Sequence, residues 1–251
     1  MRHRSDFDLT PMTEELFRED ATLLTCEATV VAVDDAGVVL DRTVFYPLGG
    51  GQAGDAGVLR LPDGREVVVV DTRKHKALPG AIAHVMAADV DLASITPGLR
   101  VTACIDTARR RAHMRFHTAT HLLCALVPHP VDGCSITAGY ARLDFHMTEP
   151  LDKDALTAGI ARLVAGAHPI GHRWITEEEL DANPSLVRSM SVQPPRGLGR
   201  VRVLEIEGVD LQPCGGTHVG NTAEVGAVVV TKIEKKSAQT RRVVLGFADA
   251  S

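Results

Sequence analysis

Two pairs of side chains with the same spacing carry the chemistry of this sequence. His117 and His121 are four residues apart, and Cys214 and His218 repeat that spacing far downstream. An α-helix places residues i and i+4 on one face, so His117 and His121 can point at a single ion. Imidazole and thiolate ligands select zinc over magnesium or calcium, which prefer oxygen ligands. The four residues therefore predict one Zn²⁺ site assembled from two distant segments.

Each pair also has a simpler interpretation. A helix carries two histidines at this spacing by chance, and the segment around His117 lacks the general-base glutamate of His-Glu-x-x-His proteases. The two glycines between Cys214 and His218 would weaken a regular helix. An ordinary glycine turn with a free thiol is therefore the alternative for the second pair. The two pairs together favour a metal site.

The metal ligands need a helix and a set of strands to hold them. Apolar periodicity predicts a helix over 108–126, which carries His117 and His121, and a second helix over 151–165 with Asp152 as its cap. Further strands are expected at 99–105, 201–206, 225–233 and 242–247. The first 98 residues show short strands between turn signals, which is typical of a small barrel or sandwich. Strands and helices that do not alternate strictly indicate an α+β fold.

Composition places the chain among cytosolic proteins. No apolar run is long enough to span a bilayer and no secretory signal is evident, so we expect a cytoplasmic protein without membrane association. The odd number of cysteines, five, argues for reduced thiols.

The net charge of −5 does not indicate a nucleic-acid partner, but basic residues near the ligand pairs suggest a phosphate-binding rim, with solvated surface charge as the alternative. The candidates for this rim are Arg109, Arg110, Arg111, Arg115, Lys235, Lys236 and Arg241.

A glycine-rich loop, Gly49-Gly50-Gly51-Gln52, is the third feature. It lacks the Gly-Lys-Ser/Thr of a phosphate-binding P-loop, and it leads into a strand pattern rather than a helix, unlike a dinucleotide-binding motif. A flexible hairpin turn would explain it. Three consecutive glycines before a glutamine instead suggest a loop that approaches something bulky.

Three blocks together resemble the editing module of alanyl-tRNA synthetase and its free-standing relatives, the alanyl-tRNA editing proteins. The blocks are Phe45-Tyr46-Pro47 with Gly49-Gly50-Gly51-Gln52, Asp55 and Gly57; Arg111 with His117-Thr118-Ala119-Thr120-His121-Leu122-Leu123; and Asp210-Leu211-Gln212-Pro213-Cys214-Gly215-Gly216-Thr217-His218-Val219. They occur in the family's order and the likeness covers about residues 14 to 247. No tRNA-charging domain accompanies them, so we expect the stand-alone form that edits in trans.

The resemblance implies a fold and an activity. The fold is an N-terminal small β-barrel domain with the glycine-rich loop at 1–98, followed by an α/β two-layer, zinc-binding editing domain at 99–251. The activity is hydrolysis of the ester in mischarged Ser-tRNA(Ala), and also Gly-tRNA(Ala), with tRNA(Ala) as the partner. A synthetase pocket cannot fully reject a similar small amino acid, so a second hydrolytic site is physically sensible.

The resemblance also assigns roles to residues. Zinc would be held by His117, His121, Cys214 and His218, and would lower the pKa of the attacking water. Four protein ligands close a tetrahedral site, whereas catalytic zinc keeps a position open. His218 is therefore the weakest candidate for a permanent ligand, and we also consider it for proton transfer. Gln212 is a second candidate for a catalytic role, through support of the Cys214 loop.

Substrate contacts are expected from two segments. Ser135 and Thr137 are placed to bind the serine hydroxyl, which would disfavour alanine by leaving a polar group unpaired, although ordinary strand polarity explains each one singly. Gly49, Gly50, Gly51 and Gln52 are expected near the editing pocket or the tRNA end. A carboxylate such as Asp106 or Asp144 is expected to orient a ligand histidine.

Two other functions stay open from the sequence. One is editing of another mischarged tRNA such as Ser-tRNA(Thr), since threonyl-tRNA synthetase carries a related module with two ligand pairs; the Gly49–Gln52 loop favours the alanyl branch. The other is a non-catalytic tRNA-binding protein with structural zinc. The sequence does not determine an oligomeric state.

Overall fold

The computed structural model describes residues 12–190, 193–194, 197 and 199–248, which form two units. The first unit contains the described residues up to Leu48 and residues 54–107. The second contains residues 49–53 and everything described from Ala108 onward. The glycine-rich segment therefore belongs to the second unit, although residues of the first unit flank it on both sides.

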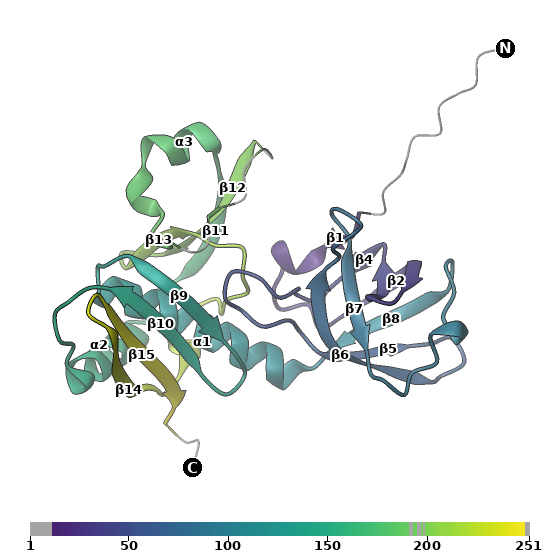
Figure 1. Cartoon of the computed structure of the whole chain (residues 1–251), viewed down its shortest axis with the longest axis horizontal. Coiled ribbons are helices and arrows are strands. Elements are labelled where there is room, and N and C mark those ends of the chain that lie inside the picture. The colour runs from purple at the N-terminus through teal and green to yellow at the C-terminus, as the bar shows by residue number, and fades with distance from the viewer. Residues whose placement is uncertain (1–11, 191–192, 195–196, 198, 249–251) are drawn as a thin grey trace. The chain divides into compact units, whose positions relative to one another are not determined.

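The first unit is a closed β-barrel (Figure 1). Its strands, in order around the barrel, are β2 (Thr25–Asp34), β3 (Gly37–Leu40), β7 (Ile82–Met86), β6 (Glu66–Lys74), β5 (Gly57–Arg60) and β8 (Arg100–Ile105). In β8, Val101, Ala103 and Ile105 are buried while the residues between them are more exposed, which is the two-residue period of a strand with one face in a core. The short parallel strands β1 (Glu14–Glu15) and β4 (Arg42–Thr43) and the 3₁₀ turns η1 (Leu16–Arg18) and η2 (Leu92–Ser94) complete the unit.

Strand β8 changes the expected domain boundary. The sequence placed this strand at the start of the second domain, after a boundary at residue 98. In the structure β8 pairs with both β2 and β5 and so closes the barrel. Because strand pairing is long-range, the residues that precede the strand, Thr96-Pro97-Gly98, could not show which unit the strand would join. The chain enters the second unit only at Ala108, within the first turn of the following helix.

The second unit has a four-stranded antiparallel sheet with helices packed on it (Figure 1). Its strands, in order, are β14 (Val228–Ser237), β15 (Thr240–Phe247), β10 (Ala141–His146) and β9 (Val131–Ile136). Helix α1 (Thr107–Leu126) stacks Phe116 on Phe247 of β15. Helix α2 (Lys153–Ala165), capped by Asp152 as expected, packs closely on α1 at Gly159, where a β-carbon would lie 2.8 Å from Leu126.

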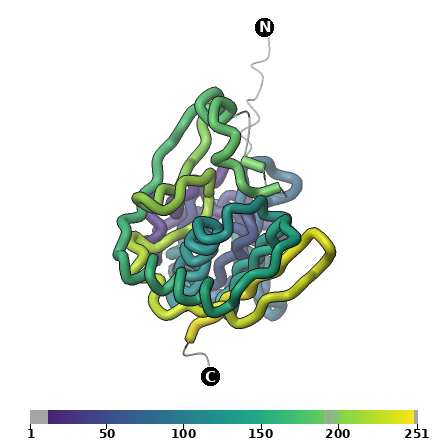
Figure 2. The backbone as a smooth tube through the Cα atoms, turned by 90° about the vertical axis from the view of Figure 1, so that its left-hand side faces the viewer, coloured from purple at the N-terminus to yellow at the C-terminus, as the bar shows by residue number. Residues whose placement is uncertain are grey.

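A second, three-stranded sheet carries the other ligand segment. It contains β11 (Ile170–Thr176), β12 (Arg200–Ile206) and β13 (Asp210–Pro213) in that order. Helix α3 (Glu177–Ala182), which begins with a capping box between Thr176 and Glu179, and the 3₁₀ turn η3 (Pro184–Leu186) follow β11 and are seen at the top of Figure 2. A further 3₁₀ turn, η4 (Thr222–Val225), precedes β14. Ile175, Leu180, Val201 and Val203 form the core beneath α3.

The α+β fold class and the N-terminal barrel are confirmed. Most expected elements lie within a few residues of the observed ones, but β11 and β13 were not expected. Within the described ranges, no helix combines the length and the apolar character that crossing a membrane requires.

Candidate metal centre

Helix α1 presents the first ligand pair. His117 and His121 lie in its middle and are 5% and 7% exposed. Their rings are 5.6 Å apart between centroids, as expected for side chains one turn apart on one face. Buried neighbours such as Phe116 and Leu122 fix the helix against the rest of the unit. The helix thus holds both imidazoles in place before any ion binds.

The loop after β13 brings the second pair to the same place. The Cys214 sulfur lies 3.5 Å from His117 Nε2 and 3.2 Å from His218 Nε2. One ligand atom from each of the four residues falls within 4.8 Å of all the others. Arg202 on β12 fixes the loop because its guanidinium donates to the carbonyl oxygens of Cys214 and Gly216.

Every ligand histidine uses its Nδ1 for a contact with protein. The three pairs are His117 with Gln52 Oε1 at 2.8 Å, His121 with Asp210 Oδ2 at 2.8 Å, and His218 with Thr118 Oγ1 at 3.2 Å. A partner on one ring nitrogen sets which nitrogen is free to bind a metal. The Nε2 atoms are therefore the ones left to face the ion.

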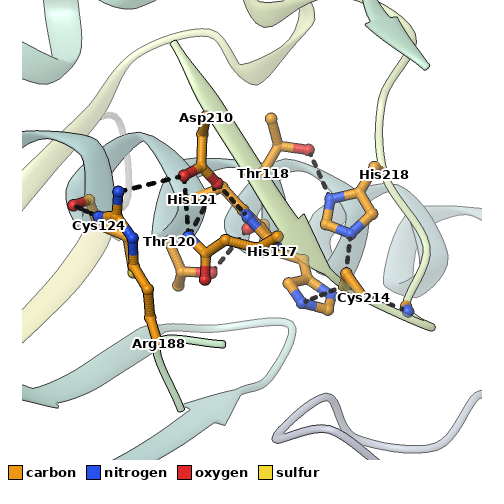
Figure 3. Close-up of polar contacts among 11 residues, drawn as sticks. His117, Thr118, Thr120, His121, Cys124, Arg188, Asp210, Cys214 and His218 are labelled. Carbon is orange, nitrogen blue, oxygen red and sulfur yellow. Dashed lines mark hydrogen bonds and ion pairs between the residues drawn. The ribbon is translucent and has the colours of Figure 1, made fainter. Parts of the chain in front are cut away.

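Asp210 is the carboxylate of this centre (Figure 3). It lies between His121 and Arg188, whose guanidinium is 3.9 Å from Asp210 Oδ1. Gln212 donates its amide hydrogens to both carboxylate oxygens, at 3.0 and 2.9 Å. Arg188 also donates to the carbonyl of Cys124. This network holds Asp210, and Asp210 in turn holds the His121 ring.

The site's electrostatics suit a cation. Burial alone would raise the pKa of the Cys214 thiol, but the interactions with the neighbouring His117, His218 and His121 outweigh it and hold the pKa well below its ordinary value. Burial and the neighbouring His117 lower the pKa of His218 to about 3. For His121, the Asp210 hydrogen bond and the Cys214 sulfur overcome burial and raise the pKa to about 10. A thiolate and a carboxylate thus meet in one buried place, where positive charge is favourable.

These residues fit zinc. Zinc–nitrogen and zinc–sulfur bonds of about 2.0–2.3 Å imply ligand-to-ligand distances of about 3.3–3.6 Å in a tetrahedron. The two sulfur–nitrogen distances, 3.5 and 3.2 Å, are close to that range. Three imidazoles and one thiolate form a donor set typical of zinc.

Comparison with known proteins identifies the family. Residues 201–244 match the sequence model of the threonyl and alanyl tRNA synthetase second additional domain, and residues 14–109 match that of class II (A) tRNA synthetases. An alanyl-tRNA editing protein AlaX-M of Methanosarcina barkeri is 36% identical over 95% of this chain and 100% of its own length. The chain belongs to the alanyl-tRNA editing protein family. A second AlaX-M, from Saccharolobus solfataricus, is 33% identical over 92% of this chain and 98% of its own length.

The family relationship extends to longer proteins. An alanine–tRNA ligase of Metallosphaera sedula is 34% identical over 90% of this chain, which spans 25% of the ligase. This chain and the ligase therefore share a segment that includes both the barrel and the candidate metal centre.

The glycine-rich loop of this family member is a tight turn. Gly49 and Gln52 exchange both backbone hydrogen bonds, while Gly50 and Gly51 have φ values of 59° and 85°. Positive φ at both central residues is a requirement of type I′ turns and favours glycine. The loop then joins β9 through hydrogen bonds of Gly51 and Ala53 with Ile136. It places the Gln52 side chain against His117, a contact that the prediction of a substrate-binding loop did not include.

Two residues predicted for catalysis or substrate binding have other contacts. The Gln212 amide donates to Asp210 and supports that carboxylate, and its catalytic role stays a prediction. The Thr137 hydroxyl donates to the Tyr140 carbonyl and accepts from two backbone N–H groups of the β9–β10 turn, which commits it to the turn. Ser135 is half-buried on β9 and stays a prediction.

Three of the residues predicted to bind tRNA make contacts within the second unit, and their role in tRNA binding stays a prediction. Arg110 is buried, with 1% of its surface exposed. Arg115 stacks on Phe247 and donates to the Val225 carbonyl. Arg241 is buried and donates to backbone carbonyls, including that of Ser237. Sequence alone could not separate these structural arginines from solvated ones.

The remaining predicted tRNA contacts are more accessible. Arg111 and Lys235 are exposed, and Arg109 is half-buried. Lys236 is exposed and pairs with Asp144.

Sequence reasoning overlooked Asp210 as the orienting carboxylate. Of the two expected candidates, Asp144 instead pairs with Arg142, Lys236 and Arg242, and Asp106 is exposed. The sequence did contain a signal for this role, because Asp210 is a carboxylate only four residues before the candidate ligand Cys214. Thr118, next to His117, also supports the site, because its hydroxyl lies 3.2 Å from His218 Nδ1.

Proposed function

We propose that this chain hydrolyses the ester that links serine, and also glycine, to tRNA(Ala), with Zn²⁺ held by His117, His121, Cys214 and His218. One observation carries the proposal: three Nε2 atoms and one thiolate converge while every Nδ1 has a protein partner. The relatives are named alanyl-tRNA editing proteins, which supports tRNA(Ala) as the partner.

The reaction adds water across an ester. A water oxygen bonds to the carbonyl carbon, the bond to the terminal ribose oxygen breaks, and that oxygen leaves as a hydroxyl. Bound zinc would supply Lewis acidity toward the carbonyl and a lowered pKa for the attacking water. Gln52, Asp210 and Thr118 hold the ligand imidazoles so that their Nε2 atoms stay on the Cys214 side. Editing in trans places the protein where tRNAs are charged, the cytoplasm.

The test is serine release from Ser-tRNA(Ala) beside Gly-tRNA(Ala) and correct Ala-tRNA(Ala). We expect hydrolysis of the first two and sparing of the third. The variants His121→Ala and Cys214→Ala should lose both zinc and activity. Matched controls are His146→Ala, at an exposed histidine, and Cys104→Ala, at a barrel cysteine. If both ligand variants fold, lose zinc and still deacylate at the parental rate, the metal role is wrong.

A second candidate is a tRNA-binding protein with structural zinc. It is favoured by the four protein ligands, which close a tetrahedral site in the way that structural zinc sites do. An absence of any deacylation by the zinc-loaded parent, together with retained tRNA binding, would select it.

Editing of Ser-tRNA(Thr) is the alternative within the same chemistry. The matched domain is named for both threonyl and alanyl synthetases. Including Ser-tRNA(Thr) in the assay separates the two, and preferential hydrolysis of it would overturn the alanyl assignment.

A further inference from the structure

Gln52 is the buried centre of a hydrogen-bonded bridge within the second unit. Its side chain is 0% exposed. Its Oε1 lies 2.8 Å from His117 Nδ1 and 3.2 Å from the Thr217 backbone nitrogen, and its Nε2 lies 3.0 Å from Thr217 Oγ1. One carboxamide thus touches helix α1 and the Cys214–His218 loop, the two segments that supply all the metal ligands.

The partners of Gln52 fix the orientation of its amide. A backbone N–H can only donate, so the atom that faces the Thr217 nitrogen must be the carboxamide oxygen. The amide nitrogen then faces the Thr217 hydroxyl, which can accept. Because the same oxygen faces His117 Nδ1 and cannot donate, Nδ1 must carry the hydrogen. His117 Nε2 is then the unprotonated nitrogen, and it is the one beside the Cys214 sulfur.

We propose that Gln52 is a positioning residue of the metal centre, which fixes His117 as the Nδ1–H tautomer and ties it to the Cys214–His218 loop. In water both tautomers of a neutral imidazole are populated, and only one of them presents Nε2 to a metal. Gln52 is neutral, so it orients His117 without the added charge that Asp210 gives His121. This inference deepens the proposed function, since it concerns the same site.

Two glycines allow the close packing around Gln52. A β-carbon on Gly216 would lie 2.1 Å from His117 Cε1 and 3.0 Å from Gln52 Oε1. A β-carbon on Gly51 would lie 2.8 Å from the Cys134 sulfur, and Gly51 also has a positive φ. Gly51 therefore lets the glycine-rich loop pack on β9, and Gly216 lets the Cys214–His218 loop approach the His117 ring.

The first test compares zinc affinity by chelator competition in three variants and the parent. Gln52→Leu keeps similar bulk but removes the acceptor and leaves the Thr217 N–H unpaired. We expect zinc binding about 10- to 100-fold weaker, the usual cost of losing such a partner. Gln52→Glu retains an oxygen for His117 Nδ1–H and should recover most of that affinity. Gln239→Leu, at an exposed turn, is the matched control and should bind as the parent does.

The second test reads the tautomer directly. Imidazole ¹⁵N shifts of His117 in the metal-free parent at mildly alkaline pH should show hydrogen on Nδ1, and Gln52→Leu should show a mixture. Parental zinc affinity in a folded Gln52→Leu, equal losses in Gln52→Leu and Gln52→Glu, or an Nε2–H tautomer in the parent would each overturn the proposal.

The outcomes separate this inference from the proposed function. If the parent neither binds zinc nor hydrolyses mischarged tRNA, the proposed function fails, while the tautomer measurement still decides the role of Gln52. If the parent does both and Gln52→Leu matches it in zinc affinity and tautomer, the role of Gln52 alone fails.

Discussion

Replacing Asp210 with asparagine should weaken zinc binding without unfolding the second unit. The carboxylate accepts from His121 Nδ1 at 2.8 Å and from the Gln212 amide at two oxygens, and Arg188 lies 3.9 Å away. Asparagine keeps the shape but loses the charge, and it presents an NH₂ group to one of these donors. Partners of ligand histidines are worth about 10- to 100-fold in metal affinity, or about 1.4–2.7 kcal/mol. Asp210 is at least as well placed as an average partner, so we expect a loss in that range.

The assay is competition for zinc with a chromophoric chelator, with folding checked by circular dichroism. Asp132→Asn is the matched control, because Asp132 also faces a histidine Nδ1, that of His146, at 3.3 Å in a more exposed pair. The control should bind zinc as the parent does. A folded Asp210→Asn with parental zinc affinity would refute the reasoning that this carboxylate organises the centre.

Three further predictions concern Gly216, His84 and Asp144. Gly216→Ala must displace His117 and should weaken zinc binding about tenfold or more, whereas Gly171→Ala, in open space, should not; equal affinities in a chelator titration would contradict this. Burial lowers the pKa of His84 to about 4. The free energy of unfolding measured in urea should therefore decrease by up to about 3 kcal/mol as the pH falls from about 6.5, the pKa in the unfolded chain, toward 4, and His84→Asn should flatten that pH dependence. Asp144→Asn should lower the free energy of unfolding by about 2–3 kcal/mol, because Arg142, Lys236 and Arg242 lose their buried partner. The zinc affinity should stay unchanged, and weaker zinc binding would show that Asp144 orients a ligand histidine after all.

The local elements followed from the sequence because their causes are local. The helix that carries His117 and His121 was expected at 108–126 and spans Thr107–Leu126, since its apolar periodicity and the following Pro128 are properties of that segment. Asp152 was expected to cap the second helix and accepts from two backbone N–H groups there. The strand expected at 201–206 is β12, which spans Arg200–Ile206.

The allocation of elements to units depended on long-range pairing. Strand β8 was correctly expected as a strand but assigned to the wrong domain. Its hydrogen bonds go to β2 and β5, more than 40 residues earlier in the chain, and no local signal encodes such partners. For the same reason burial separated Arg110 from Arg111, although the two adjacent arginines look alike in sequence.

By itself, the sequence determined the types of the four candidate ligands and the four-residue spacing within each pair. Imidazole and thiolate donors at that spacing indicate a zinc site. Only the tertiary structure decided which side chains hold those ligands. Gln52 contacts His117, 65 residues away in the chain, and Asp210 contacts His121, 89 residues away. Asp144 instead pairs with cations such as Arg242. The physical reason is that periodicity sets which face of an element a residue occupies, whereas the packing of distant elements sets what that face meets.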